Sequence, residues 1–222
     1  MKIYLIRHGE TALKASGAYQ GWIDEPLSKD GKMALGYGTA HAFGALSTGS
    51  PHPPGGWVYV SPMRRARETA SLVLPYSRQV VVENLKEMHF GDFEGRTPDE
   101  MKNDPAYRAW VDSGCLDRCP NGETKDEFSA RTCAAFEALV DMALRRGDQA
   151  LFIVAHGGTQ MAVMETFVDP SRPFYAWLLD CGMGYILDTA PWAAERRLAW
   201  NDGLVDCMWK DSVPLYDIRC AF

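Results

Sequence analysis

The chain has 222 residues and a formal net charge of −6, and its length fits one domain spanning residues 1–222. The acidic balance argues against a nucleic-acid-binding protein, because such proteins usually present a basic surface. No apolar run approaches the length of a membrane span, and the N-terminus lacks the pattern of a secretory leader. We therefore expect a cytoplasmic protein with no membrane partner.

The first half of the chain alternates between short apolar runs and helical patterns. Apolar runs of three to five residues predict strands, and longer segments with helical spacing predict helices. Two glycines weaken the first predicted helix, since glycine costs helix stability relative to alanine. In chain order we expect a strand at Lys2–Ile6, a helix at Ser28–Phe43, a loop at Ser47–Gly56, a strand at Trp57–Val60, a helix at Arg64–Leu74 and a strand at Val80–Val82.

The second half contains the clearest helical pattern. Thr124 and Glu127 form a capping box, and Gly147 ends the same helix. Before it, residues 90–123 are irregular, and residues 96–123 are expected to form a lid. Strands that alternate with helices predict a doubly wound α/β fold, with a mostly parallel central sheet flanked by helices. The remaining expected elements are a short helix near Pro98–Asn103, a strand at Leu151–Ala155, a helix at Met161–Val168 and strands at Gly184–Asp188 and Arg197–Asn201.

Two of the predicted strands end in a histidine followed by a glycine. One runs into Arg7-His8-Gly9, and the other runs into His156-Gly157. Open α/β sheets bind their ligands at the carboxyl edge, so two imidazoles and an arginine could meet there. A neutral imidazole suits a nucleophile, an arginine pairs with phosphate oxygens, and a carboxylic acid protonates a leaving oxygen. These residue types favour phosphoryl-transfer chemistry.

Five blocks of sequence resemble the histidine phosphatase (phosphoglycerate mutase-like) superfamily, in the order in which that family has them. The likeness is to the phosphatase branch, similar to α-ribazole phosphatases and broad-specificity phosphatases. A single Arg-His-Gly tripeptide would be weak evidence, whereas five ordered blocks are specific. The blocks are Arg7–Thr11 with Tyr19–Trp22, Ser61–Ala66, Glu87–Gly95, Pro120–Glu123 and His156–Gly158.

The resemblance implies a role for each candidate residue. His8 would become phosphohistidine, and Arg7 and Arg65 would hold the phosphoryl oxygens. His156 would donate a further hydrogen bond, and Glu87 would donate and then accept the proton. The candidate substrate-binding residues are Lys14, Gly21 and Gly157.

Two interpretations stay open at several positions around the expected site. Lys14 stands where the family usually has an asparagine, and it either binds a second anionic group of the substrate or points into solvent. Tyr107, Trp110 and Phe93 either contact the leaving group or pack the lid onto the domain.

We expect a phosphomonoesterase that hydrolyses a small phosphorylated metabolite, with no metal ion and no cofactor. The 69 residues from Glu87 to His156 resemble the shorter phosphatase branch of the family. The alternatives are a phosphoglycerate mutase and a non-catalytic module that binds a phosphorylated ligand. The six cysteines are expected to be reduced and to form no zinc site. The natural substrate and the oligomeric state stay open.

Overall fold

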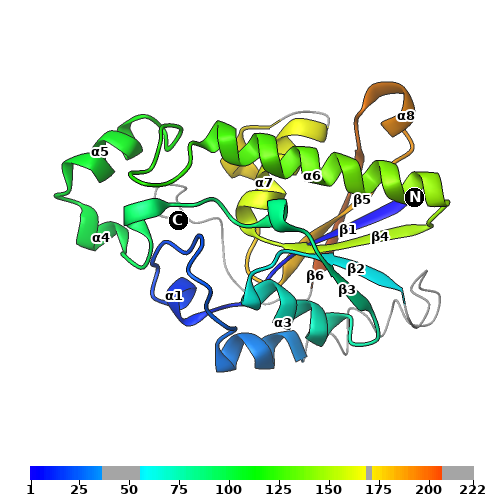
Figure 1. Ribbon diagram of the computed structural model, residues 1–222, viewed down its shortest axis with the longest axis horizontal. Coiled ribbons are helices and arrows are strands. Elements are labelled where there is room, and N and C mark those ends of the chain that lie inside the picture. The colour runs from blue at the N-terminus through cyan, green and yellow to red at the C-terminus, as the bar shows by residue number, and fades with distance from the viewer. Residues whose placement is uncertain (37–55, 169–171, 207–222) are drawn as a thin grey trace.

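A six-stranded sheet forms the centre of the computed structural model, which describes residues 1–36, 56–168 and 172–206 (Figure 1). The strand order is β3-β2-β4-β1-β5-β6. The strands are β1 Lys2–Arg7, β2 Trp57–Val60, β3 Arg78–Val81, β4 Ala150–Ala155, β5 Met183–Asp188 and β6 Ala199–Asp206.

Four of these strands are parallel, which brings their carboxyl ends to one edge of the sheet. β4 pairs with β1 and β2, and β2 pairs with β3, all in parallel, whereas β5 and β6 add two antiparallel pairings. The prediction of a mostly parallel sheet is confirmed. Residues 29–36 are helical, and the other helices are α1 Ala12–Ala15, α3 Arg64–Val73, α4 Pro98–Met101, α5 Pro105–Asp112, α6 Lys125–Arg146, α7 Gly157–Phe167 and α8 Trp192–Glu195.

Alternate side chains of β1 pack into two cores on opposite faces of the sheet. Ile3 and Leu5 belong to the core that includes apolar residues of α6 and α7. Tyr4 and Ile6 belong to the core that includes three residues of α3. Figure 1 shows α6 and α7 on one side of the sheet and α3 on the other. A strand with both faces buried reads as a continuous apolar run, as the sequence of β1 does.

The segment 96–123 carries two short helices beyond the carboxyl ends of the parallel strands (Figure 1). A capping box between Thr97 and Glu100 begins α4, and the side chain of Asp104 caps α5. Sequence analysis expected one helix near Pro98–Asn103 and was wrong to leave α5 in the irregular stretch. Pro105 opens α5 at its first position, where proline needs no hydrogen-bond partner for its nitrogen and so begins a helix rather than breaking one.

Helix α7 also begins earlier than expected, at Gly157 rather than Met161. Glycine has low helix propensity, so the two glycines after His156 suggested a turn. Every residue from Gly157 to Met164 is buried, however, and packing against the sheet outweighs that low propensity. The first turn of α7 is consequently placed at the carboxyl end of β4.

Other expectations hold with shifted ends. The capping box at the start of α6 is present, and Gly147 ends that helix with φ of +72°. The predicted strand Val80–Val82 occurs as Arg78–Val81, because pairing with β2 begins earlier. The helix expected at Ser28–Phe43 is seen through residue 36, and its remainder, like residues 47–55 of the expected loop, lies outside the described residues. Within the described ranges, no helix is long and apolar enough to cross a bilayer.

Candidate active site

The two histidines that follow β1 and β4 lie against each other. Parallel pairing continues to the ends of both strands, and the His8 amide donates to the Ala155 carbonyl at 2.9 Å. The ring centroids of His8 and His156 are 5.1 Å apart, with an angle of 64° between the planes. The expected meeting of the two strand-end imidazoles is therefore present in the structure.

The His8 imidazole is held in one orientation and in its neutral form. Its Nδ1 lies 2.7 Å from the Gly9 carbonyl oxygen. A carbonyl oxygen only accepts, so Nδ1 carries the proton and Nε2 keeps its lone pair. Burial, with the positive charges of Arg65 and Arg7, lowers the pKa of His8 well below its ordinary value. His8 is 4 % exposed, and its neutral ring is nucleophilic at neutral pH.

His156 is fully buried and contacts the serine that follows β2. Its Nε2 lies 2.7 Å from Ser61 Oγ, which also accepts a hydrogen bond from the Met63 amide at 3.3 Å. This arrangement favours Ser61 as donor to Nε2 and places the proton of the neutral ring on Nδ1. Burial is the main cause that lowers the pKa of His156 well below its ordinary value, followed by the charge of Arg65.

Two arginines bring positive charge to the histidines. Arg65 is fully buried, and its Nη1 and Nη2 donate to the carbonyls of Ile23 at 2.9 Å and Gly21 at 2.7 Å. Burial lowers the pKa of Arg65 to about 10, which leaves it charged at neutral pH. Arg7 is 7 % exposed and donates through Nη1 to the Leu179 carbonyl.

Three buried nitrogen atoms of this group have no hydrogen-bond partner among the described residues. They are Nε of Arg7, Nε of Arg65 and Nδ1 of His156. A buried donor without a partner costs about 1–3 kcal/mol, so such groups are rare unless they have a function. An anion with several oxygen atoms is the ligand that this set of donors fits.

Glu87 presents a carboxylate to the same region. Its Oε1 accepts from the Met88 amide at 2.9 Å, and its Oε2 accepts from the Gly158 amide at 3.1 Å. Position 158 has no room for a side chain, because a Cβ there would lie 2.1 Å from Glu87 Oε1. A Cβ at Gly157 would lie 3.1 Å from Arg7 Cζ. The glycines of the His-Gly-Gly block thus allow the carboxylate and the guanidinium to approach the helix backbone.

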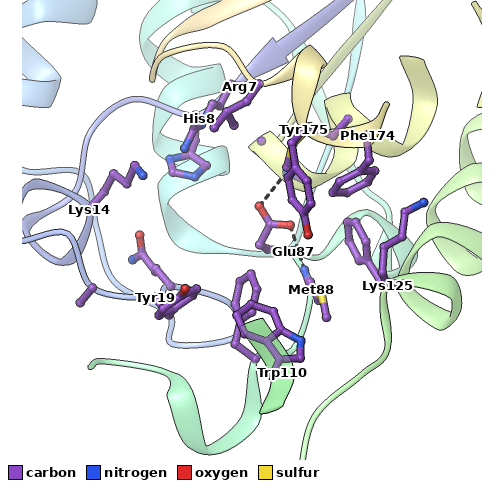
Figure 2. A pocket seen from close by; sticks show the side chains of 18 residues that line it. Arg7, His8, Lys14, Tyr19, Glu87, Met88, Trp110, Lys125, Phe174 and Tyr175 are labelled. Carbon is purple, nitrogen blue, oxygen red and sulfur yellow. Dashed lines mark hydrogen bonds between the residues drawn. The ribbon is translucent and has the colours of Figure 1, made fainter. Parts of the chain in front are cut away.

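A pocket of about 690 Å³, counting the open space at its mouth, lies over these groups (Figure 2). Figure 2 shows Lys14 on the same side as His8, with Phe174 and Lys125 across from them and Glu87 between. Lys14 is half-buried, and burial together with the charge of Arg7 lowers its pKa. The lining is Arg7, His8, Lys14, Ala18, Tyr19, Gln20, Glu87, Met88, Phe90, Trp110, Lys125, Phe128, Gly157, Gly158, Met161, Phe174, Tyr175 and Leu178.

Not every predicted residue lines this pocket. Arg65, His156 and Gly21 are buried beside it, and Gly21 contributes its carbonyl to Arg65. Of the three aromatic residues left open by the sequence, Trp110 lines the pocket, whereas Tyr107 and Phe93 do not. Those two rings pack against each other at 5.4 Å and against Trp110.

Several pocket residues were missed by sequence analysis. Lys125 is the first residue of α6, and Phe174 and Tyr175 lie on a short 3-10 helix, Phe174–Trp177. Phe174 and Tyr175 stand beside no recognisable motif, and the capping box around Lys125 signals the start of a helix rather than a binding site. Among the described residues, no group of three histidine, cysteine or carboxylate side chains could hold a metal ion.

The model of the histidine phosphatase superfamily (branch 1) matches residues 3–183. This chain belongs to the histidine phosphatase superfamily. It is 34 % identical over 197 residues to the adenosylcobalamin/alpha-ribazole phosphatase of Salmonella typhimurium strain LT2, covering 85 % of this chain and 90 % of that protein. It is 31 % identical over 203 residues to a protein of Escherichia coli O1:K1 named as a probable phosphoglycerate mutase, GpmB, covering 89 % of this chain and 80 % of the relative.

The fold is shared with a solved structure. The alpha-ribazole phosphatase from Shigella flexneri superposes with a TM-score of 0.72 at 24 % identity, covering 96 % of this chain and 100 % of that one. The phosphoglycerate mutase-like fold expected from the sequence is confirmed. The superfamily and the Salmonella relative support a phosphatase as the activity class.

Proposed function

We propose that this chain is a phosphomonoesterase that hydrolyses a small phosphorylated substrate through a phosphohistidine on His8. The observation that carries the proposal is a neutral, oriented imidazole that lines a pocket. Two guanidinium groups lie beside it, and the Glu87 carboxylate lies in the same pocket. The buried donors without partners, on Arg7, Arg65 and His156, supply the contacts that the phosphoryl oxygens need.

In the first step, the lone pair of His8 Nε2 attacks phosphorus and forms a P–N bond. The bond between phosphorus and the ester oxygen breaks, and its electron pair goes to the leaving oxygen. A proton from the Glu87 carboxylic acid neutralises that oxygen. The His8 Nδ1 proton stays directed at the Gly9 carbonyl throughout, which stabilises the positive charge that develops on the ring.

In the second step, a water molecule attacks the phosphohistidine. The Glu87 carboxylate takes a proton from the water as its oxygen bonds to phosphorus, and the P–N electron pair returns to His8 Nε2. Inorganic phosphate then leaves, and Glu87 is again protonated. Arg7, Arg65 and His156 Nδ1 hold the phosphoryl oxygens in both steps, so the charge that a metal ion supplies elsewhere comes from side chains.

The wall of the pocket supports a leaving group with apolar surface. Aromatic side chains dominate the lining beyond Glu87, where Phe90, Trp110, Phe174 and Tyr175 lie. We propose that residues 96–123 act as a lid that supplies Trp110 to this wall. Tyr107 anchors the lid, because its hydroxyl hydrogen-bonds the Tyr19 hydroxyl at 2.9 Å.

Lys14 is proposed as a further phosphate-binding cation. Its side chain lines the pocket, so it does not simply point into solvent. Burial, and after it the positive charge of Arg7, lowers the pKa of Lys14. A bound dianion would offset the repulsion between the positive charges of Lys14 and Arg7. The pocket would therefore favour the dianionic form of a phosphomonoester.

The test is phosphate release from a panel that includes p-nitrophenyl phosphate, α-ribazole phosphate, phosphoserine and sugar phosphates, with and without EDTA. We expect metal-independent hydrolysis, a trapped acid-labile phosphoenzyme, and loss of both in His8→Ala while the thermal unfolding transition is retained. Turnover in His8→Ala would refute the mechanism. Isomerisation of 3-phosphoglycerate in place of hydrolysis would identify a mutase, and binding of phosphate without release would identify a binding module.

A further inference from the structure

Glu87 lies in an irregular segment, outside the strands and helices that fix the other site residues. β3 ends at Val81, a short 3-10 helix spans Glu83–Leu85, and residues 86–90 have no regular structure. A general acid must hold its oxygen within hydrogen-bond reach of the leaving group, so an irregular backbone needs support from elsewhere. The structure shows where that support comes from.

Arg131, on α6, binds this segment through its backbone. Its Nη1 donates to the carbonyl oxygens of Asn84 at 3.1 Å and Lys86 at 2.9 Å, and its Nη2 donates to the carbonyl of Glu87 at 2.8 Å. The guanidinium therefore contacts three carbonyls within four residues. The indole Nε1 of Trp22 donates to the same Glu87 carbonyl at 3.0 Å.

Glu123 holds Arg131 in place and closes the arrangement on the far side of Glu87. Its Oε1 accepts from Arg131 Nε at 2.6 Å, and its Oε2 accepts from Arg131 Nη2 at 2.8 Å. The same Oε2 accepts from the His89 amide at 2.9 Å. The side chains of Glu123 and Arg131 are only 17 % and 19 % exposed, so solvent weakens this two-point ion pair less than it would a surface pair.

We propose that the Arg131–Glu123 pair is a positioning device that sets the Glu87 carboxylate for proton transfer. Arg131 hydrogen-bonds the backbone up to Glu87, and Glu123 hydrogen-bonds the backbone two residues after it. The planar guanidinium can serve three carbonyls and a carboxylate at once, which a lysine ammonium cannot do. Neither residue lines the pocket, and the hydrogen bonds described above engage the guanidinium and the carboxylate with each other and with the backbone around Glu87.

The inference depends on the proposed role of Glu87 and predicts a dependence on the leaving group. A p-nitrophenolate leaves without a proton, whereas an alkoxide such as that of β-glycerol phosphate needs one from Glu87. The quantity to measure is kcat/KM, because it reports phosphoryl transfer to His8 and departure of the leaving group. A displaced Glu87 lowers this constant for the alkyl ester much more than for the aryl ester.

We expect Arg131→Lys to lower kcat/KM for β-glycerol phosphate by about 10- to 100-fold, and for p-nitrophenyl phosphate by less than about threefold. Inhibition by inorganic phosphate should be unchanged, since Arg7, Arg65 and His156 keep their places. Glu87→Gln is the reference variant, because it shows the full difference between the two esters when the proton donor is removed. Arg145→Lys is the matched control on the same helix, because Arg145 is exposed and far along α6 from this segment.

Equal losses for the two esters, or no loss for either, would overturn the positioning role. Glu123→Gln provides a second, milder variant if Arg131→Lys does not fold, and the same selective loss is expected from it. The proposed function would instead be contradicted by a wild-type protein that hydrolyses neither ester. It would also be contradicted by a Glu87→Gln variant that loses no more activity on the alkyl ester than on the aryl ester. If Glu87→Gln loses activity selectively on the alkyl ester while Arg131→Lys leaves kcat/KM unchanged for both esters, only the positioning role is contradicted.

Discussion

Lowering the pH from 7.5 to 5.5 is expected to destabilise the fold through the two buried site histidines. Burial and the neighbouring arginine charges lower the pKa values of His8 and His156 well below the ordinary value in the folded protein. An unfolded histidine titrates near a pKa of about 6.5. Over this interval the unfolded chain binds protons at both positions and the folded chain does not. Stability from these groups is therefore full above pH 6.5 and is lost as the pH falls below it.

The size of the loss follows from proton binding in the unfolded state. Each histidine with an unfolded pKa of about 6.5 that stays neutral when folded loses about 1.4 kcal/mol between pH 7.5 and 5.5, and the pair loses about 2.7 kcal/mol. Carboxyl groups whose pKa is lowered in the fold, such as Asp141 and Asp188, titrate mainly at lower pH and contribute little in this window. A loss of this size is a large part of a typical stability.

Urea unfolding at the two pH values measures this effect directly. The buffer must lack phosphate, because a ligand that binds only the folded state would mask the change. His8→Asn removes one of the two groups, so its loss between pH 7.5 and 5.5 should be smaller than that of the wild type by about 1.4 kcal/mol. A variant with the wild-type dependence on pH, or a wild type with none, would refute the assignment of neutral, buried imidazoles.

Three further substitutions, one of them with a matched control, give expected outcomes. Gly158→Ala places a Cβ 2.1 Å from Glu87 Oε1, so kcat/KM for an alkyl phosphate should fall by about 100-fold; activity within about threefold of wild type would contradict the geometry. Gly91→Ala, at φ +56° and with a backbone oxygen 1.9 Å from its Cβ, should lower the free energy of unfolding by about 2–4 kcal/mol. Gly17→Ala, at φ +76° in open space, is its control and should cost only about 1 kcal/mol in urea unfolding. Lys14→Met should weaken inhibition by inorganic phosphate about tenfold, and an unchanged inhibition constant would show that Lys14 does not bind the anion.

The sequence by itself was enough to predict which residues lie at the ends of β1 and β4. The apolar runs within β1 and β4 are buried on both faces. Such runs can be recognised in the sequence because each consists of neighbours in the chain. Once parallel pairing is expected, His8 and His156 must come to the same edge of the sheet. The start of α6 was equally legible, because a capping box depends on residues only three positions apart.

Only the tertiary structure decided how Glu87 is held and what surrounds the substrate. Arg131 is 44 residues from Glu87 in the chain. It binds backbone carbonyls, which every residue has, so the amino-acid sequence does not indicate which of them it contacts. Phe174 and Lys125 enter the pocket from separate elements, and α7 begins at Gly157 because burial overrides the low helix propensity of glycine. Patterns among neighbours reveal where a strand or helix lies, whereas contacts between distant segments arise only when the chain packs.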